Sequence, residues 1–527
     1  MKSITNPILR GFNPDPSILR VGDDYYIAVS TFEWFPGVLI HHSRDLVHWR
    51  IAARPLDRTE LLDMEGNPPS GGVWAPCLSF RDGLFYLVYS DAKATGRFKD
   101  VHNYVTTSPS IDGAWSPRVY LNSSGFDPSF FHDQDGRTWL LNMQWDFRPR
   151  RNRFAGILMR EYDRAAGALS GPEHLIFTGT RLGVTEGPHL YRKNGLYYLM
   201  TAEGGTGLGH AVTVARAGSI TGPYQVDPEN PILTSADSPT AELQKAGHGS
   251  LVETQGGEPY MVHLCTRPIA RRGKSFLGRE TAIQKMVWTE DGWLRLAGGG
   301  RAPRVAVEAP DLPPHPWPAG PACDDFESPV LGAEYQSPRV PLMETDFSLT
   351  ERPGFLRLRG GESPTSRHRQ VLLARRLQGF SASVSTCLEF RPESYQQLAG
   401  LILLYDTENF FYLRVSLDER LGKCVGLFAW DRGAPEQPGA DVTVEGWERC
   451  HLRAQVDYDR LQFSFGPDGR SWTPIGPVLD TSKLSDEYCN RAYEGAFTGA
   501  FAGLTCQDFT GRRLAADFDY FEYRERE

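Results

Sequence analysis

Short apolar runs, each preceded by a turn sequence, recur through the first 300 residues of the chain. The runs are rich in tyrosine, phenylalanine and branched aliphatic residues, a composition typical of β-strands. Asp-Gly, Asn-Gly or a similar pair stands before each run, and such pairs favour hairpins because both residues can adopt positive φ. The pattern predicts strands at 25–29, 84–89, 138–141, 196–200 and 259–263.

A short element containing Pro or Gly precedes each of these runs at a matched offset. The elements begin at Asp15, Ala75, Asp127, Gly187 and His248, with separations of 60, 52, 60 and 61 residues. Five degenerate copies of one unit predict a five-bladed β-propeller. The innermost strand of each blade lines the central channel, so we expect the starts of the repeats to converge at one point.

The pattern changes near residue 303, where seven prolines fall between residues 302 and 322. A stretch of this composition is typical of a linker. Alternating strand-like runs follow it, without a long helical period, and they predict a β-sandwich. These later strands are expected at 355–359, 384–390, 410–415, 452–456 and 461–465. The predicted organisation is a propeller at 1–305, a linker at 306–322 and a sandwich at 323–527.

Composition narrows the classes of function. The chain has 527 residues, 40% hydrophobic and 23% charged, which excludes intrinsic disorder. Its net charge of −9 argues against a nucleic-acid partner, which would require a basic face. No apolar run is long enough to cross a bilayer, so no membrane partner is expected. No signal peptide is visible after Lys2, and the eight cysteines form no C-x-x-C pair, so we expect a cytoplasmic protein.

Three acidic residues occupy equivalent places in three repeats. Asp15 and Asp127 each precede a proline, and Glu186 precedes Gly187-Pro188. An Asp before Pro is commonly only a turn residue. Three carboxylates gathered at one channel mouth repel one another, however, and such a cluster indicates a function. A metal site and glycoside hydrolysis are both compatible with it.

Longer motifs around these acids resemble those of family 43 glycoside hydrolases, in the two-domain β-xylosidase branch. The resemblance covers essentially the whole chain. It rests on N-P-I-L-R-G-F-N-P-D-P-S at 6–17, G-G-V-W-A-P at 71–76, G-F-D-P-S-F-F at 125–131, T-E-G-P-H-L-Y at 185–191, G-H-G-S-L-V-E-T at 247–254, L-G-R-E-T at 277–281 and F-T-G-A-F at 497–501. It implies a concanavalin- or laminin-G-like sandwich behind the propeller.

The resemblance also implies a role for each polar site residue. Asp15 matches the general base, Glu186 the general acid, and Asp127 the carboxylate that orients the acid and raises its pKa. Arg279 matches an arginine that contacts the substrate. His248 matches a channel histidine that orients the base or the substrate and that lies near a bound calcium in some relatives. No cofactor is expected to be required.

Four aromatic residues match pocket walls of that branch. A flat ring can stack on the apolar face of a pyranose, which is why aromatic residues line sugar sites. Phe32, Trp74 and Trp145 are expected to line the channel mouth. Phe501 is expected to lie on a loop of the sandwich that closes the pocket, with burial inside the sandwich as its alternative.

The expected activity is an exo-acting, inverting β-1,4-xylosidase that releases xylose from non-reducing ends of xylo-oligosaccharides, with α-L-arabinofuranosidase side activity. Relatives imply a homo-oligomer, a dimer or tetramer. The alternatives are a dedicated α-L-arabinofuranosidase and a non-catalytic carbohydrate-binding propeller. A metal-dependent phosphoesterase is more distant, because the site lacks several histidine ligands.

Overall fold

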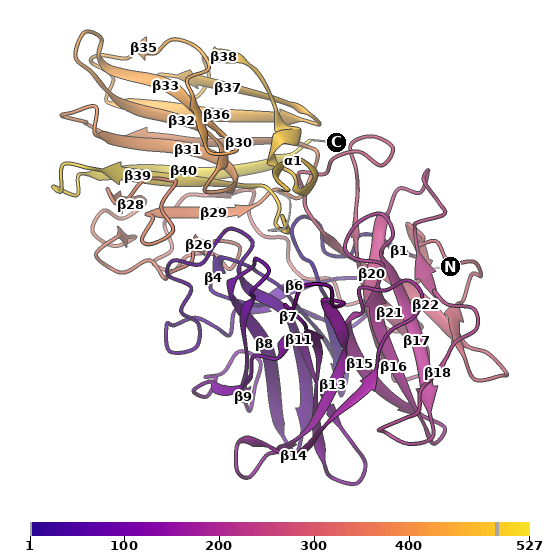
Figure 1. Ribbon diagram of the computed structural model, residues 1–527. Helices are drawn as coiled ribbons and strands as arrows, with labels where there is room; N and C mark the ends of the chain where they lie inside the picture. The colour runs from indigo at the N-terminus through magenta and orange to yellow at the C-terminus, as the bar shows by residue number, and fades with distance from the viewer. Residues whose placement is uncertain (1–2, 491–494, 527) are drawn as a thin grey trace. The chain divides into compact units, whose positions relative to one another are not determined.

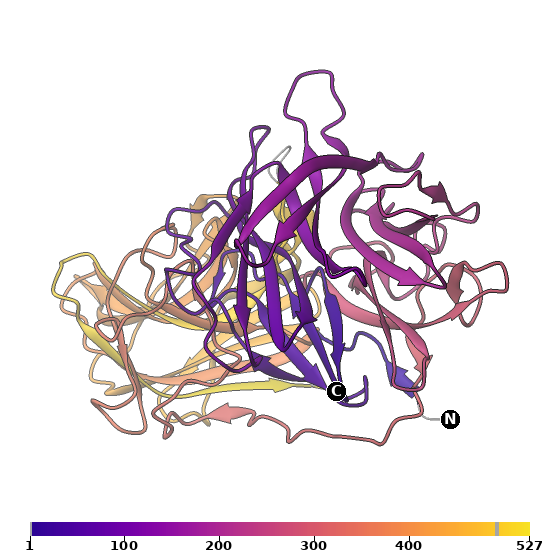
Figure 2. The ribbon, with the colours of Figure 1, turned by 90° about the horizontal axis from the view of Figure 1, so that it is seen from below.

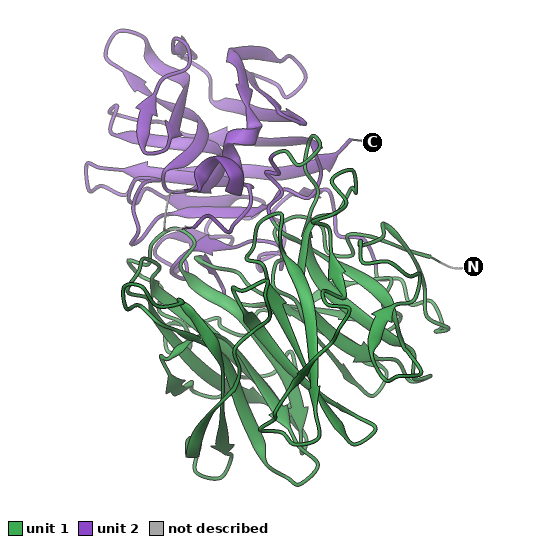
Figure 3. Ribbon diagram, turned by 45° about the vertical axis from the view of Figure 1, so that its right-hand side comes forward, with its two compact units in different colours: residues 1–33, 37–273, 279–317 green, residues 34–36, 274–278, 318–527 purple. Residues whose placement is uncertain are grey.

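A computed structural model describes residues 3–490 and 495–526 of the chain. Almost all regular structure in these ranges is β-strand, and the chain forms two compact units. Figure 3 colours them separately. Unit 1 comprises Met1–Glu33, Gly37–Gly273 and Arg279–Trp317, and unit 2 comprises Trp34–Pro36, Lys274–Gly278 and Pro318–Glu527. The change of unit after Trp317 falls inside the segment predicted as a linker.

Unit 1 is a five-bladed β-propeller, as predicted. Each blade is an antiparallel sheet whose first strand is its inner strand, and the blades follow one another from indigo to pink in Figure 1. Each inner strand contacts the inner strands of the two neighbouring blades, and β2 contacts β20, which closes the ring. The inner strands are β2 (Ser17–Val21), β7 (Gly72–Arg81), β11 (Gly125–His132), β15 (Glu186–Lys193) and β20 (Gln244–Glu253).

The second strand of every blade contains one of the five predicted runs. Tight turns join it to the inner strand, as the Asp-Gly and Asn-Gly pairs require. The remaining strands are β3 (Asp24–Val29), β5 (Leu39–Ser43) and β6 (Arg50–Ala53) in blade 1; β8 (Leu84–Ala94), β9 (Asp100–Ser108) and β10 (Val119–Asn122) in blade 2; β12 (Thr138–Trp145), β13 (Phe154–Asp163) and β14 (Ala168–Phe177) in blade 3; β16 (Leu196–Glu203), β17 (Ala211–Ala217), β18 (Gln225–Val226) and β19 (Leu233–Thr234) in blade 4; and β21 (Pro259–Thr266), β22 (Glu280–Trp288) and β23 (Leu294–Leu296) in blade 5.

The predicted linker is partly ordered on the propeller. β24 (Ala306–Glu308) pairs with β1 (Ser3–Thr5), so the end of unit 1 lies beside its beginning (Figure 2). Trp317 packs under the Arg50 guanidinium, which lies 3.9 Å from the centre of the indole. Residues 306–317, which were predicted as part of the linker, belong to unit 1.

Apolar side chains between neighbouring blades form the core of unit 1. Ile27 and Val29 of β3 pack in one cluster with Tyr260 and Val262 of β21, and all four side chains are fully buried. Alternate residues of these strands face the cluster, which is why the period-two pattern could be read from the sequence. Blade-to-blade packing of this kind holds the inner strands in fixed positions around the channel.

Unit 2 is the predicted β-sandwich, built from an eight-stranded and a seven-stranded antiparallel sheet. The first sheet has the order β27 (Phe347–Ser348), β28 (Leu356–Arg359), β40 (Ala515–Glu525), β30 (Ser381–Glu389), β36 (Arg449–Asp457), β37 (Arg460–Gly466) and β38 (Thr473–Asp480), with β25 (Cys323–Asp324) also paired to β40. The second has the order β29 (Leu372–Arg376), β39 (Phe501–Asp508), β31 (Gln397–Asp406), β32 (Asn409–Asp418), β33 (Gly422–Asp431) and β34 (Ala434–Glu436), with β35 (Val442–Thr443) also paired to β33.

Two short segments that precede the predicted linker in the sequence, Trp34–Pro36 and Lys274–Gly278, belong to unit 2. β4 (Trp34–Phe35) pairs with β26 (Ser337–Pro338), and the amide of Ala500 donates a hydrogen bond to the carbonyl of Phe276. A 3₁₀ turn at Thr481–Leu484 and the short helix α1 (Asp486–Cys489) complete the elements. No helix in the described ranges is long and apolar enough to span a membrane.

Candidate active site

The five residues that begin the sequence repeats share one backbone conformation. Asp15, Ala75, Asp127, Gly187 and His248 have φ of 53°, 35°, 56°, 56° and 53°. In four blades the pairing register between the first two strands also shifts at this point. Left-handed backbone at a bulge re-aims a side chain out of the regular alternation, and bulges of this kind are common beside active sites. Four non-glycine residues accept this strained conformation at equivalent positions.

The three predicted acids lie on inner strands or within two residues of the start of one. Asp15 precedes β2, Asp127 lies near the start of β11, and Glu186 is the first residue of β15. All three are buried, with at most 8% of each residue exposed. The amide of Gly187 donates a hydrogen bond to Asp127 Oδ2 at 3.0 Å, which joins the acid-bearing turns of blades 3 and 4. The structure therefore brings together the carboxylates that the repeats placed in register.

Asp15 is surrounded by groups that favour its ionised form. Arg279 Nη1 donates a hydrogen bond to Asp15 Oδ1 at 2.9 Å, and Ser30 Oγ donates one to Oδ2 at 2.7 Å. His248 Nδ1 lies 3.7 Å from Oδ1. Burial alone would raise the pKa of Asp15, but the charge of Arg279 and the other partners outweigh it and lower the pKa below its ordinary value of 3.8.

Glu186 is in the opposite electrostatic environment. Burial raises its pKa well above the ordinary value of 4.5, and the negative charges of Asp127 and Asp15 raise it further. Burial also raises the pKa of Asp127 to about 8, with a second contribution from the charge of Asp15. These environments favour the ionised form of Asp15 and the protonated form of Glu186, the combination that a general base and a general acid would need.

The surroundings of His248 favour its neutral form. Burial lowers its pKa below 6.5, and the charge of Asp15 only partly opposes that effect. A side chain on Gly187 would lie about 2.9 Å from His248 Nε2, so the positive-φ glycine also leaves room for the imidazole. His248 therefore packs between the bases of the acid-bearing turns, beside Asp15.

A row of aromatic rings runs through blades 1, 2 and 3. The ring centres of Phe32 and Trp74 are 6.3 Å apart, those of Trp74 and Phe126 are 5.3 Å apart, and those of Phe126 and Trp145 are 6.0 Å apart. The Arg279 guanidinium lies 5.3 Å from the centre of Phe32. The structure thus places Phe32, Trp74 and Trp145 in one continuous row with Arg279 at its end.

Sequence reasoning missed three residues of the site. Ser30 donates to the base, and its Oγ accepts a hydrogen bond from the amide of Ala75 at 2.7 Å, which fixes its orientation. Phe126 bridges two of the predicted aromatic residues. Lys99 Nζ lies 4.8 Å from the ring centre of Trp145 and 5.3 Å from that of Trp74. Phe126, next to Asp127, could have been found from its place in the motif, whereas no signal around Lys99 marks it.

Lys99 interacts electrostatically with the acid. Burial lowers the pKa of Lys99 to about 8, and the negative charge of Glu186 opposes this change. In turn the positive charge of Lys99 lowers the pKa of Glu186. Its ammonium donates a hydrogen bond to the carbonyl of Thr95 at 2.6 Å. Lys99 is thus a second cation of the site besides Arg279, next to Trp145 and close enough to Glu186 to affect its pKa.

Comparison with known proteins agrees with this arrangement. The family model "Glycosyl hydrolases family 43" matches residues 4–294, and "Beta xylosidase C-terminal Concanavalin A-like domain" matches residues 323–524. The chain belongs to glycosyl hydrolase family 43. It is therefore a glycoside hydrolase, and the predicted family and fold class are confirmed.

Several relatives match this chain along nearly its full length. The crystal structure of a xylan β-1,4-xylosidase from Bacillus halodurans C-125 is 53% identical, with a TM-score of 0.97 over 99% of this chain and 100% of that one. A xylosidase/arabinosidase 43B of Humicola insolens is 48% identical over 99% of this chain and 98% of its own length. A xylan 1,3-β-xylosidase of a Vibrio species is 47% identical, with 99% of both chains covered.

Phe501 does not have the environment expected of a pocket wall. It is the first residue of β39 and is fully buried. Its ring stacks on Trp34 of the same unit, with centres 3.7 Å apart and planes 15° apart. A side chain with no exposed surface cannot stack on a sugar, so the assignment of Phe501 to substrate binding is corrected to a packing role. The alternative, burial inside the sandwich, describes it better.

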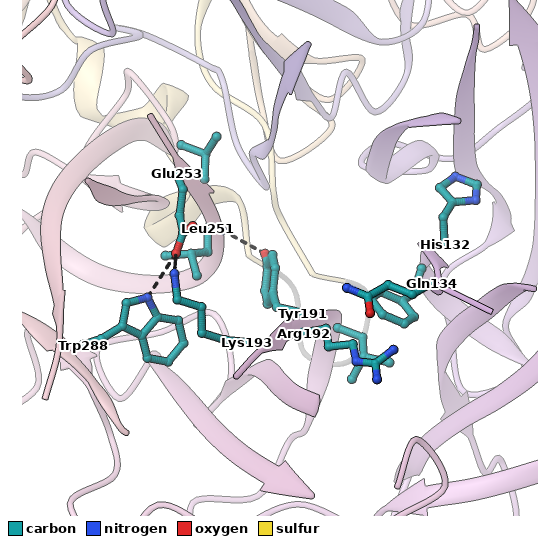
Figure 4. A pocket seen from close by; sticks show the side chains of 11 residues that line it. His132, Gln134, Tyr191, Arg192, Lys193, Leu251, Glu253 and Trp288 are labelled. Carbon is teal, nitrogen blue, oxygen red and sulfur yellow. Dashed lines mark hydrogen bonds and ion pairs between the residues drawn. The ribbon is translucent and has the colours of Figure 1, made fainter. Parts of the chain in front are cut away.

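A separate cavity of about 340 Å³ lies at the opposite ends of the inner strands (Figure 4). It contains none of the three acids. Its charged lining is paired, since Lys193 Nζ and Trp288 Nε1 both donate to Glu253 Oε1. Among the described residues no group of three or more His, Cys, Asp or Glu side chains is arranged to hold a metal ion. The expected calcium near His248 remains a prediction.

Proposed function

We propose that the protein is an exo-acting, inverting β-1,4-xylosidase that releases xylose from the non-reducing ends of xylo-oligosaccharides. The observation that carries the proposal is the opposite environment of two carboxyl groups in one site. Arg279 and Ser30 favour the ionised form of Asp15, whereas burial and neighbouring negative charges favour the protonated form of Glu186. Inverting hydrolysis requires one group of each kind.

In the proposed reaction Asp15 accepts a proton from a water molecule while that water attacks the anomeric carbon. Glu186 donates its proton to the bridging oxygen as the glycosidic bond breaks. The products are α-xylose and an oligosaccharide shortened by one unit. Asp15 leaves the step protonated and Glu186 ionised, and exchange of both protons with solvent restores the enzyme. Arg279 and Ser30 keep the base in place, and Asp127 holds the acid in its neutral form before the reaction.

The choice of xylose is supported by what the chain resembles. A structure at 53% identity is titled a xylan β-1,4-xylosidase. A relative of similar identity is named a 1,3-β-xylosidase, so the linkage requires a direct test. Kinetics on β-1,4-xylobiose, β-1,3-xylobiose and polymeric xylan provide it. Faster hydrolysis of the 1,3-linked disaccharide would refute the linkage, and internal cutting of xylan would refute exo action.

A second candidate, α-L-arabinofuranosidase activity, has support of its own. A relative at 48% identity carries both activities in its name. The two sugars present similar hydroxyl groups around the reacting carbon, so the same acids can serve both. We propose arabinofuranosidase as a side activity. Comparison of the two 4-nitrophenyl glycosides tests it, and a higher kcat/KM on the arabinofuranoside would reverse the order of the two activities.

The proposal includes two further statements. Hydrolysis requires no metal, because the carboxyl groups supply both proton transfers. Full activity after dialysis against a chelator is the expected result, and a loss of activity that calcium restores would refute this statement.

The protein assembles as a dimer or tetramer, as its family suggests, and light scattering after size-exclusion chromatography measures this. A monomeric mass would contradict it.

A further inference from the structure

Two phenylalanines in the loops that contain Lys99 and follow Trp145 are unusually exposed. Phe98 is 69% exposed and Phe147 is 46% exposed. They lie on different blades, Phe98 between β8 and β9 and Phe147 between β12 and β13. Their ring centres are nevertheless only 4.8 Å apart, with planes 33° apart. Because so little of the surface of these two rings is buried in the core, the pair indicates an interaction site and not a packing role.

The pair is held on a fixed framework. The Arg97 side chain donates hydrogen bonds to the carbonyls of Phe147 and Arg148 at 2.9 and 3.0 Å. In the reverse direction Trp145 Nε1 donates to the carbonyl of Arg97 at 3.0 Å. These three bonds connect the two loops through both of their backbones. The rings are therefore presented by a preorganised surface, which lowers the entropy lost on binding.

The framework lies on the leaving-group side of the site. Glu186 must reach the bridging oxygen, so the departing sugar lies on the side of the acid. Lys99 interacts with Glu186, and its ammonium lies over the ring of Trp145. The departing sugar therefore meets Lys99 and Trp145 first. Phe98 directly precedes Lys99 in one loop, and Phe147 follows Trp145 by two positions in the other.

We propose that Phe98 and Phe147 form a binding position for the third sugar of the substrate, counted from the non-reducing end. A xylopyranose has no exocyclic carbon, so its ring presents flat C–H faces that can stack on an aromatic ring. The first sugar lies at the acids and the second at Lys99 and Trp145. The third reaches the exposed pair, and the enzyme consequently favours xylotriose over xylobiose. This inference rests on the proposed function.

The test compares kcat/KM on xylobiose and xylotriose for the parent enzyme, Phe98→Ala, Phe147→Ala and Phe98→Tyr. Each alanine variant should lose about 2- to 12-fold on xylotriose, the range of one aromatic contact, mainly through KM. Xylobiose, which does not reach the pair, should be unaffected. Phe98→Tyr keeps a flat ring and should keep the preference for xylotriose. Tyr120→Ala is the matched control, because Tyr120 is 55% exposed on the outer strand β10 of blade 2.

Equal losses on both oligosaccharides, or no loss on either, would overturn the inference. Failure of the proposed function would look different, because the parent enzyme would then hydrolyse neither xylobiose nor xylotriose. In that case calorimetric binding of xylotriose to the parent and to Phe98→Ala still decides the role of the pair. Weaker binding by the variant supports it, and equal binding or none refutes it.

Discussion

Arg279 Nη1 donates a hydrogen bond to Asp15 Oδ1 at 2.9 Å, although the two residues stand 264 positions apart in the chain. Arg279 directly precedes β22 of the last blade, and Asp15 lies two positions before β2 of the first. Closure of the propeller ring therefore creates the ion pair. The amide of Asn13 donates to the carbonyl of Arg279 at 2.9 Å, which fixes the two segments together. The ionisation of the base thus depends on correct closure of the fold.

Replacement of Arg279 by Ala should raise the pKa of Asp15, because burial then acts without its main opposing charge. The acid limb of kcat/KM should move to higher pH, and activity at neutral pH should fall by about 100-fold or more, as expected when a general base is compromised. A pH profile measures both effects. Arg267→Ala is the matched control, because Arg267 pairs with buried Glu280, which is no part of the acid cluster. Arg267→Ala should reduce stability without moving the acid limb of kcat/KM. An equal shift of that limb in both variants would contradict the effect of Arg279 on the pKa of Asp15.

The repeat pattern predicted the blades and the three acids because both follow from local sequence. A hairpin signal and a matched offset indicate which residue begins each inner strand. Closure of the ring of blades then brings these residues together. The same reasoning could not find Lys99, whose place beside Glu186 depends on a loop between β8 and β9 without a motif. Nor could it place Phe501, because stacking on Trp34 is a contact between residues far apart in sequence and carries no local signal.

Two neighbours of Glu186 should move its pKa in opposite directions. Asp127 raises it, so Asp127→Asn should lower it and shift the alkaline limb of kcat/KM to lower pH. Lys99 lowers it, so Lys99→Met should shift the same limb to higher pH. The sign follows because the acid is active only when protonated, and activity is lost as the pH rises through its pKa. Profiles on xylobiose, which needs an acid, measure the shifts. Movement in the same direction would exclude electrostatic control of Glu186 by these residues.

The identity of the acid can be separated from that of the base by the leaving group. Glu186→Ala should lose much more activity on xylobiose than on a 4-nitrophenyl or dinitrophenyl xyloside, because only the poor leaving group needs a proton. Asp15→Ala should damage all substrates alike, since every one requires an activated water. Steady-state kinetics on the series gives the comparison. A uniform loss in the Glu186 variant would remove it from the acid role.

The stereochemical outcome follows from placing the acid and the base on separate blades. A water must fit between Asp15 and the sugar, so the carboxyl groups of Asp15 and Glu186 are expected about 6.5–9.5 Å apart in the productive complex. Proton NMR during early hydrolysis of a β-xyloside should then show α-xylose first, before mutarotation. Initial formation of β-xylose would make Asp15 a nucleophile instead of a base.

Phe501→Ala tests the corrected role of that residue within unit 2. Removing a fully buried ring that stacks on Trp34 leaves a cavity, so the free energy of unfolding should fall by about 3–5 kcal/mol. Thermal unfolding followed by calorimetry should show a lower Tm. At a temperature where the variant is folded, KM for xylobiose should match that of the parent enzyme, because the ring has no exposed surface to offer a sugar. Phe501→Leu is the control that keeps most of the buried volume, and it should recover much of the stability. A raised KM with an unchanged Tm would restore the pocket-closing role, because the ring would then contribute to substrate binding and not to stability.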